Sequence, residues 1–187
     1  LQALSRAFMP GPLHPANCTI IIRMETPEFK TVGIVGAGAM GRGIAQIAAQ
    51  AGSKVLLFDT QADAVAKARE SVAAQWDKLV EKGRIDAAAA AAQKERVQPA
   101  ATLADLAPCD LIVEAIVERL DVKKGLFAEL EGIVQITAVL ATNTSSLSVT
   151  AIAAGLKRPQ QFAGFHFFNP VPLMKVVECI AGLKTDP

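Results

Sequence analysis

Short runs of consecutive apolar residues alternate along this chain with longer stretches in which apolar residues recur every three or four positions. The short runs predict strands that are buried on both faces, and the longer stretches predict amphipathic helices. We expect strands at residues 30–35, 54–58, 96–100, 111–116, 138–141, 162–167 and 175–178. We expect helices at residues 39–52, 61–83, 86–95, 122–133 and 149–155, with a helix or turn at 102–106. The alternation predicts an α/β fold with a doubly wound, mainly parallel sheet and flanking helices.

The periodic pattern begins only after Met24. The preceding segment carries Arg6 and Arg23, no acidic residue and three closely spaced prolines. We therefore expect residues 1–29 to be a poorly ordered N-terminal extension and residues 30–187 to form one domain. A basic leader of this kind can also be a mitochondrial transit peptide, which remains the alternative.

Composition narrows the class of protein. The 187 residues are 51% hydrophobic and carry 19 basic and 18 acidic side chains, enough for one ordinary domain. The near-cancelling charge argues against binding to nucleic acid or to an anionic membrane, and no uninterrupted run of apolar residues is long enough to span a bilayer. The cysteines, Cys18, Cys109 and Cys179, are far apart and match no metal spacing, which fits a reducing, cytoplasmic compartment.

The first predicted strand runs directly into a glycine-rich turn that opens a helix. Its six residues are Gly36, Ala37, Gly38, Ala39, Met40 and Gly41. In this context G-x-G-x-x-G indicates the dinucleotide cradle of a Rossmann-type domain. The first glycine permits the tight turn, the second lets a pyrophosphate approach the backbone, and the third lets helix and strand pack closely. The alternative is a tight turn that binds nothing.

Asp59 ends the second predicted strand, 18 residues after Gly41. A carboxylate at this distance accepts hydrogen bonds from the ribose hydroxyls of a dinucleotide and repels a 2′-phosphate. Thr60 and Gln61 follow, with no arginine to receive that phosphate. We therefore predict NAD as the cofactor rather than NADP, and the short chain leaves little room for the flavin of FAD.

Two histidines occur, and one of them, His14, lies in the proline-rich N-terminal segment. His166 ends an apolar strand, and Glu178 ends the next predicted strand twelve residues later. A proline-containing loop between the strands could bring the two side chains together. A carboxylate on one ring nitrogen fixes the tautomer, so that the other nitrogen can take a hydroxyl proton while a hydride leaves for nicotinamide. A structural histidine and a solvated strand-end charge are the alternatives.

Further polar residues lie where the carboxyl edge of the sheet is expected. Residues 143–146 (NTSS) follow a strand, where open α/β sheets bind ligands. They could orient nicotinamide or a substrate oxygen, or they could cap the next helix. Glu114 interrupts an apolar strand and would need a partner if buried. Glu114 and Glu118 could each reach the cofactor or remain surface charges.

Five segments occur in an order that resembles a known family: GAGAMGRGIAQ, LLFD, VEAIVERLDVKKGLF, ATNTSSLSVT and GFHFFNPVPLMKVVE. Residues 30 to 187 resemble the N-terminal NAD-binding domain of 3-hydroxyacyl-CoA dehydrogenases. The resemblance implies oxidation of L-3-hydroxyacyl-CoA to 3-ketoacyl-CoA with NAD+, in fatty-acid or aromatic-derived acyl-CoA degradation. The segment VEKGRIDAAAAAA is similar to bacterial members of phenylacetate degradation that act on 3-hydroxyadipyl-CoA.

The resemblance also implies roles for individual residues. His166 matches the catalytic base and Glu178 the carboxylate that orients it. Ser145 matches the residue that hydrogen-bonds the substrate hydroxyl, and Asn169 matches a site residue near the substrate carbonyl. The positions that match contacts to NAD are Asp59, Glu118, Lys123 and Asn143.

The family has a helical C-terminal domain that is absent from this chain, which stops at Pro187. That domain implies a homodimer for the whole protein, and we expect the present chain to bind NAD with little turnover. Candidates for the phosphates of CoA are Ser71, Lys78 and Lys82, which are otherwise exposed helix residues. Two other functions stay open: a non-catalytic NAD-binding or sensing module, and a dehydrogenase of free 3-hydroxy acids.

Overall fold

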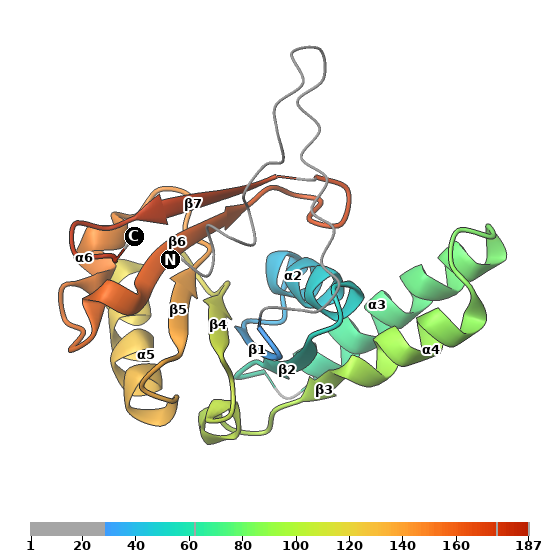
Figure 1. The fold of residues 1–187 in the computed structure, drawn as a ribbon, viewed down its shortest axis with the longest axis horizontal. Helices are drawn as coiled ribbons and strands as arrows, with labels where there is room; N and C mark the ends of the chain where they lie inside the picture. Colours follow the sequence, from blue (N-terminus) through green and yellow to red (C-terminus); the bar gives the residue numbers. More distant parts are fainter. Residues whose placement is uncertain (1–28, 62, 175, 187) are drawn as a thin grey trace, which may run out of the picture.

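The fold is a seven-stranded sheet with helices on both faces, as seen in a computed structural model that describes residues 29–61, 63–174 and 176–186 (Figure 1). The strands are β1 (Thr31–Val35), β2 (Lys54–Phe58), β3 (Val97–Pro99), β4 (Leu111–Glu114), β5 (Val139–Thr142), β6 (Phe162–Phe167) and β7 (Val177–Ala181). Their order is β3-β2-β1-β4-β5-β6-β7, with every neighbouring pair parallel except β6 and β7. The predicted doubly wound, mainly parallel sheet is confirmed.

Among the described residues, five α-helices and two short 3-10 helices connect the strands. They are α2 (Ala39–Gln50), α3 (Ala64–Glu81), α4 (Ala87–Arg96), η1 (Leu103–Leu106), α5 (Leu120–Ile133), α6 (Val149–Ala153) and η2 (Pro159–Gln161). Within the described part of the chain, no helix is both long and apolar enough to cross a membrane. Residues 1–28 of the predicted N-terminal extension lie outside the described residues.

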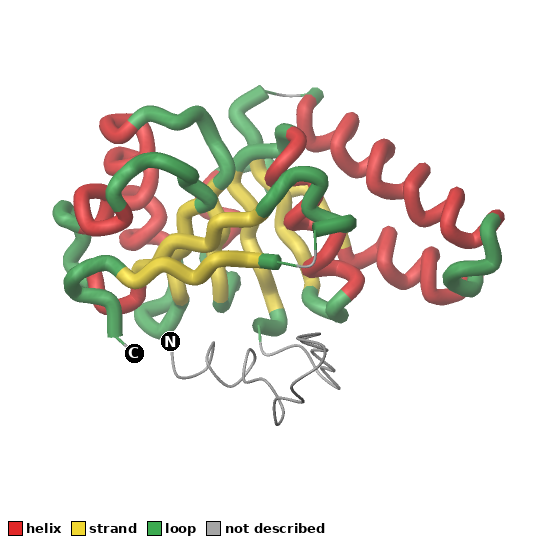
Figure 2. The backbone as a smooth tube through the Cα atoms, turned by 90° about the horizontal axis from the view of Figure 1, so that it is seen from above, coloured by secondary structure: helices red, strands yellow, loops and turns green. Residues whose placement is uncertain are grey.

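The central strands are buried on both faces because successive side chains enter two different cores. Ile34 of β1 packs with Trp76 of α3 on the face that α2, α3 and α4 cover. Val35 enters the other core, where Phe127 of α5 meets Phe162 of β6 edge-on with ring centroids 4.7 Å apart. Figure 2 shows the sheet between these two groups of helices. This two-sided burial explains why the strands are continuous apolar runs in the sequence.

The last strand departs from its predicted bounds. β7 begins at Val177 and ends at Ala181, whereas the sequence predicted residues 175–178, of which Lys175 lies outside the described residues. β7 is the antiparallel edge of the sheet, and four of its five residues are exposed. An exposed edge strand has no continuous apolar run, so its limits are set by pairing with β6 rather than by hydrophobicity.

Candidate active site

The three glycines of the turn between β1 and α2 have different structural roles. A Cβ on Gly41 would lie 1.7 Å from the carbonyl oxygen of Gly36, so close packing of helix against turn demands glycine there. Gly36 has φ +104°, and a Cβ on it would lie 2.5 Å from the carbonyl oxygen of Ala115. A Cβ on Gly38 would meet nothing within 4 Å. The fold therefore needs Gly36 and Gly41, whereas Gly38 borders open space in which a pyrophosphate can approach the backbone.

The remaining residues of the cradle present backbone rather than side chains. Gly38 is the N-cap of α2 and offers no side-chain acceptor, and the first turn of α2 contains no acidic residue. The first-turn amides, including those of Ala39 and Met40, lack intrahelical partners by their position. This end of the helix therefore suits an anion, and the residues present fit the diphosphate of a dinucleotide.

Asp59 lies against the cradle, although 18 residues separate it from Gly41 in the sequence. Its Oδ2 accepts a hydrogen bond from the backbone N–H of Ala37 at 2.7 Å, and its Oδ1 accepts from Gln61 N–H at 2.9 Å. The second bond forms a turn over residues 59–61, and α3 begins later than predicted, at Ala64 instead of residue 61. The predicted hydrogen bonds from Asp59 to the ribose stay a prediction.

His166 and Glu178 lie directly opposite each other on β6 and β7. The His166 Nδ1 and Glu178 Oε2 atoms are 2.7 Å apart, and 22% of the histidine side chain is exposed. Because a carboxylate only accepts hydrogen bonds, Nδ1 carries a proton, and in the neutral imidazole Nε2 then presents a lone pair. The structure thus brings together the two residues that the sequence pairs, although the strand carrying Glu178 has other bounds.

One hydrogen bond ties this hairpin to the polar loop that follows β5. Asn143 Oδ1 accepts from the backbone N–H of Phe167, next to His166, at 2.9 Å. Ser145 lies two residues further along that loop and is exposed. The loop of Ser145 and the strand of His166 are therefore neighbours at the carboxyl edge of the parallel strands.

Glu118 organises the same loop, which we define as residues 144–146. Its Oε1 accepts from the backbone N–H groups of Ser145 at 3.1 Å and Ser146 at 3.2 Å, and from the Thr144 hydroxyl. Partial burial acts to raise the pKa of Glu118, but hydrogen bonds from Thr144 and Ser146 and the charge of Lys123 lower that pKa to about 2. Glu118 is therefore a carboxylate that braces the loop, and its predicted contact with NAD remains a prediction.

A buried pair of opposite charges lies beneath the loop. Glu114 is fully buried, and its Oε1 lies 2.5 Å from the ammonium of Lys123, which is 1% exposed. Lys123 Nζ is also 3.3 Å from Glu118 Oε2. The expectation that a buried Glu114 would need a partner is confirmed. Lys123, a predicted NAD contact, already has two carboxylates around its ammonium.

Two residues that flank the polar run 143–146 have roles that the sequence did not resolve. Ser148 caps α6 by accepting from Ala151 N–H, so the predicted capping function belongs to a residue just beyond the run. The hydroxyl of Thr142 donates to Glu114 at 2.6 Å. A serine directly before a helical segment is a capping signal, whereas the partner of Thr142 depends on which strands are neighbours.

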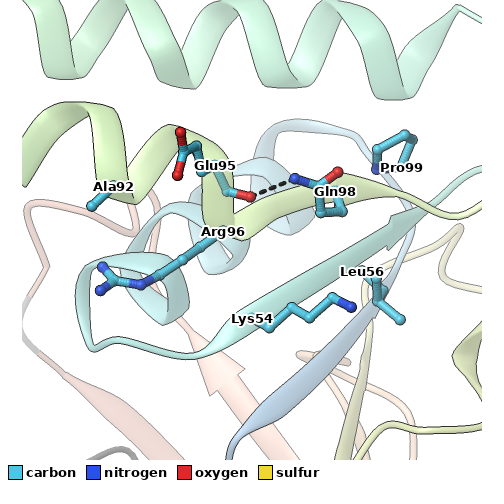
Figure 3. Close-up of a pocket in the computed structure, with 7 residues that line it drawn as sticks. All are labelled: Lys54, Leu56, Ala92, Glu95, Arg96, Gln98 and Pro99. Carbon is cyan, nitrogen blue, oxygen red and sulfur yellow. Dashed lines mark hydrogen bonds between the residues drawn. The ribbon is translucent and has the colours of Figure 1, made fainter.

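Other candidates lie apart from these contacts. Asn169 is exposed on the loop after β6. Lys78 is exposed on α3 and Lys82 is exposed directly after it, while Ser71 is half-buried on α3. A hollow of about 670 Å³ lies at the other edge of the sheet (Figure 3). It is lined by Lys54, Leu56, Ala92, Glu95, Arg96, Gln98 and Pro99. None of the predicted site residues lines this hollow, so it is separate from the candidate site.

Comparison with known proteins adds evidence from outside the chain. The family model described as "3-hydroxyacyl-CoA dehydrogenase, NAD binding domain" matches residues 31–187. A 3-hydroxyadipyl-CoA dehydrogenase of Escherichia coli is 45% identical over 158 residues, which are 84% of this chain and 33% of that protein. A 3-hydroxybutyryl-CoA dehydrogenase of Bradyrhizobium diazoefficiens is 43% identical over 158 residues, 84% of this chain and 54% of that protein.

Solved structures that resemble this chain carry names from the same family as these relatives. The crystal structure of 3-hydroxybutyryl-CoA dehydrogenase from Escherichia coli has a TM-score of 0.83 at 44% identity, covering 84% of this chain and 33% of that one. The (S)-3-hydroxybutyryl-CoA dehydrogenase of Ralstonia eutropha has a TM-score of 0.81 at 42% identity, covering 84% and 56%. The chain spans between a third and just over half of the length of these similar proteins.

Proposed function

The chain belongs to the 3-hydroxyacyl-CoA dehydrogenases, as their NAD-binding domain, and from this premise we propose that the whole protein oxidises L-3-hydroxyacyl-CoA to 3-ketoacyl-CoA. The observation that carries the proposal is the 2.7 Å contact between His166 Nδ1 and Glu178 Oε2. A domain that only bound or sensed NAD would have no need of a histidine whose second nitrogen is prepared to accept a proton.

In this proposal the residues of the hairpin and the loop share the work of alcohol oxidation. His166 Nε2 takes the proton of the substrate hydroxyl, and Glu178 stabilises the imidazolium that forms. Ser145 hydrogen-bonds the substrate oxygen, and Asn169 lies near the thioester carbonyl. When bound, NAD+ supplies the acceptor for the hydride.

The cradle provides the other half of the proposed site. Gly38 gives the diphosphate access to the first-turn amides of α2, and Asp59 receives the ribose hydroxyls. Support comes from the open space at Gly38 and from the place of Asp59 against the cradle. We propose further NAD contacts from Glu118, Lys123 and Asn143, which lie together around the loop after β5.

We also propose a partner surface for the rest of the protein. Of eight exposed large apolar side chains in the described ranges, five fall within one short stretch: Leu173, Met174, Val176, Ile180 and Leu183. Such clustering is typical of a surface that another domain or subunit covers. A helical domain of the whole protein would pack here, close the cleft and form a homodimer, which is why we expect the 187-residue chain alone to turn over slowly.

The substrate is proposed from the relatives, which are named for 3-hydroxyadipyl-CoA and 3-hydroxybutyryl-CoA. Ser71 and Lys78 on α3 are the proposed contacts for the phosphates of CoA, with Lys82 directly after the end of that helix. Since these relatives are bacterial, we place the reaction in the bacterial cytoplasm.

The test is NADH formation by the whole protein. Purified protein receives NAD+ with L-3-hydroxybutyryl-CoA, L-3-hydroxyadipyl-CoA or free 3-hydroxybutyrate. We expect a rise in NADH absorbance with at least one CoA thioester and none with the free acid. Oxidation of the free acid alone would contradict the proposal, as would wild-type rates from a His166→Ala variant.

A further inference from the structure

The buried carboxylate of Glu114 reaches the exposed loop of Ser145 through an unbroken series of contacts. We propose that Glu114 is a positioning residue that sets the conformation of loop 144–146 through Lys123 and Glu118. The role for the site rests on the proposed function, because Ser145 is the residue proposed to bind the substrate oxygen. The contacts themselves exist in the ligand-free chain and can be tested there.

Glu114 occupies a single, fixed position. It is the last residue of β4, in register with Val35 of β1 and Thr142 of β5. Its Oε2 accepts from the Thr142 hydroxyl at 2.6 Å, and its Oε1 accepts from Ile116 N–H at 2.7 Å and from Lys123. A fully buried carboxylate held by three donors from three segments has no room to move.

Lys123 connects this fixed point to the surface. It lies in the first turns of α5, and its ammonium stands between Glu114 and Glu118, 2.5 Å from one and 3.3 Å from the other. A buried ammonium requires a counter-charge. Glu114 supplies that counter-charge inside the protein. The Oε1 atom of Glu118 therefore remains available to loop 144–146, while its Oε2 atom faces Lys123.

Glu118 completes the connection at the loop itself. Its Oε1 accepts from Thr144, from the N–H groups of Ser145 and Ser146, and from the Ser146 hydroxyl at 3.2 Å. Ser145 is therefore held by its own backbone, while its side chain is left for a ligand. A Glu114 that served only to fill the core would influence nothing beyond Lys123.

Removing the charge of Glu114 should weaken the hydrogen bonds that hold loop 144–146. In Glu114→Gln the side chain keeps its shape, but Lys123 has only Glu118 as a carboxylate partner. The ammonium then moves towards Glu118 and competes with the loop donors for it. We expect the hydrogen bonds to Ser145 and Ser146 to weaken, while the distant strands β1 and β2 keep theirs.

The experiment measures amide hydrogen exchange by NMR on the ligand-free 187-residue chain, residue by residue. In Glu114→Gln we expect exchange at Ser145 and Ser146 to be faster by about tenfold, with amides of β1 and β2 unchanged. Glu114→Asp, which keeps the charge, should recover part of the protection. The matched control is Asp63→Asn, which removes an exposed carboxylate from its ion pair with Lys67 and should change neither amide.

Two outcomes overturn the proposal: unchanged exchange at Ser145 and Ser146, or an equal acceleration at every amide, which indicates general destabilisation. Should Glu114→Gln fail to fold, Glu114→Asp serves alone: it keeps the charge but draws the carboxylate back from Lys123, and it should still speed exchange at the two serines relative to the wild type. No change there also overturns the proposal. Because no substrate is present, failure of the proposed dehydrogenase activity would leave this result standing, and the reverse also holds.

Discussion

The glycine cradle and the functional end of the β6–β7 hairpin both lie at the carboxyl edge of the parallel strands. They differ in whether backbone or side chains form the site. The cradle is made of backbone, and Gly36 and Gly41 serve it by having no side chain. The hairpin presents side chains, and Glu178 lies on an edge strand that is almost wholly exposed. At Gly36 and Gly41 the cradle is therefore inseparable from packing, whereas the proposed proton-transfer pair can change without disturbing the core.

The largest expected effect on stability lies in the cradle. In Gly41→Ala the new Cβ would lie 1.7 Å from the carbonyl oxygen of Gly36, so turn and helix must separate. We expect a loss of about 3 kcal/mol or more in the free energy of unfolding, at the upper end of ordinary overpacking. Urea unfolding followed by circular dichroism measures this value.

The matched control is Gly125→Ala in the middle of α5, where a Cβ would meet nothing within 4 Å. Since alanine favours helix over glycine, this variant should gain about 0.5–1 kcal/mol. A Gly41→Ala protein as stable as the wild type would show that the cradle tolerates side chains and would remove the contrast with the hairpin.

The largest expected effect on chemistry lies in the hairpin. His166→Ala removes the proposed base, and we expect NADH formation by the whole protein to fall by about 10²- to 10⁴-fold. The melting temperature should change little, because His166 belongs to neither hydrophobic core and its partner Glu178 is 56% exposed. Cys179→Ser, an exposed change beside Glu178, is the control and should keep full activity. A large loss of stability in His166→Ala would mean that the pair supports the fold.

A smaller effect is expected from Glu178→Gln. The amide keeps the length of the side chain but can donate as well as accept, so it no longer fixes the proton on Nδ1 of His166. Turnover should fall less than in His166→Ala, and Glu178→Asp should recover part of it. Steady-state rates of the variants of the whole protein give the order, and equal rates for Glu178→Gln and wild type would exclude the orienting role.

The smallest effect concerns loop 144–146 and Glu118, the carboxylate that holds it. The pKa of Glu118 is lowered from 4.5 to about 2 in the folded chain, so its stabilising hydrogen bonds are fully present above about pH 4.5. Their contribution should shrink as the pH falls from there towards 2. The difference in unfolding free energy between wild type and Glu118→Gln, measured across this range, should decline with acid, whereas a constant difference would contradict the assignment.

The two regions also differ in how much of them the sequence predicts. Every residue of the cradle is contiguous from Gly36 to Gly41, so strand, turn and helix could be recognised together. The pairing of His166 with Glu178 could be predicted because a single hairpin joins them, although the limits of β7 could not.

The buried contacts around Glu114 were beyond sequence reasoning for a physical reason. They require β4 to lie beside β5, so that Thr142 faces Glu114, and they require α5 to bring Lys123 to both carboxylates. The order of strands in a sheet and the burial of a single ammonium follow from tertiary packing. The sequence could show only that Glu114 would need a partner if buried.

A titration of the chain with NAD+ tests the division between cofactor binding and chemistry most directly. Gly38→Ala and His166→Ala are measured beside the wild type by calorimetry, with melting temperatures as a check on folding. Since a Cβ at Gly38 meets nothing within 4 Å, that variant should fold normally yet bind NAD+ about tenfold more weakly, or worse, because the methyl occupies the approach of the pyrophosphate. His166→Ala should bind NAD+ as the wild type does. Normal binding by Gly38→Ala, or an equal loss in His166→Ala, would contradict the account.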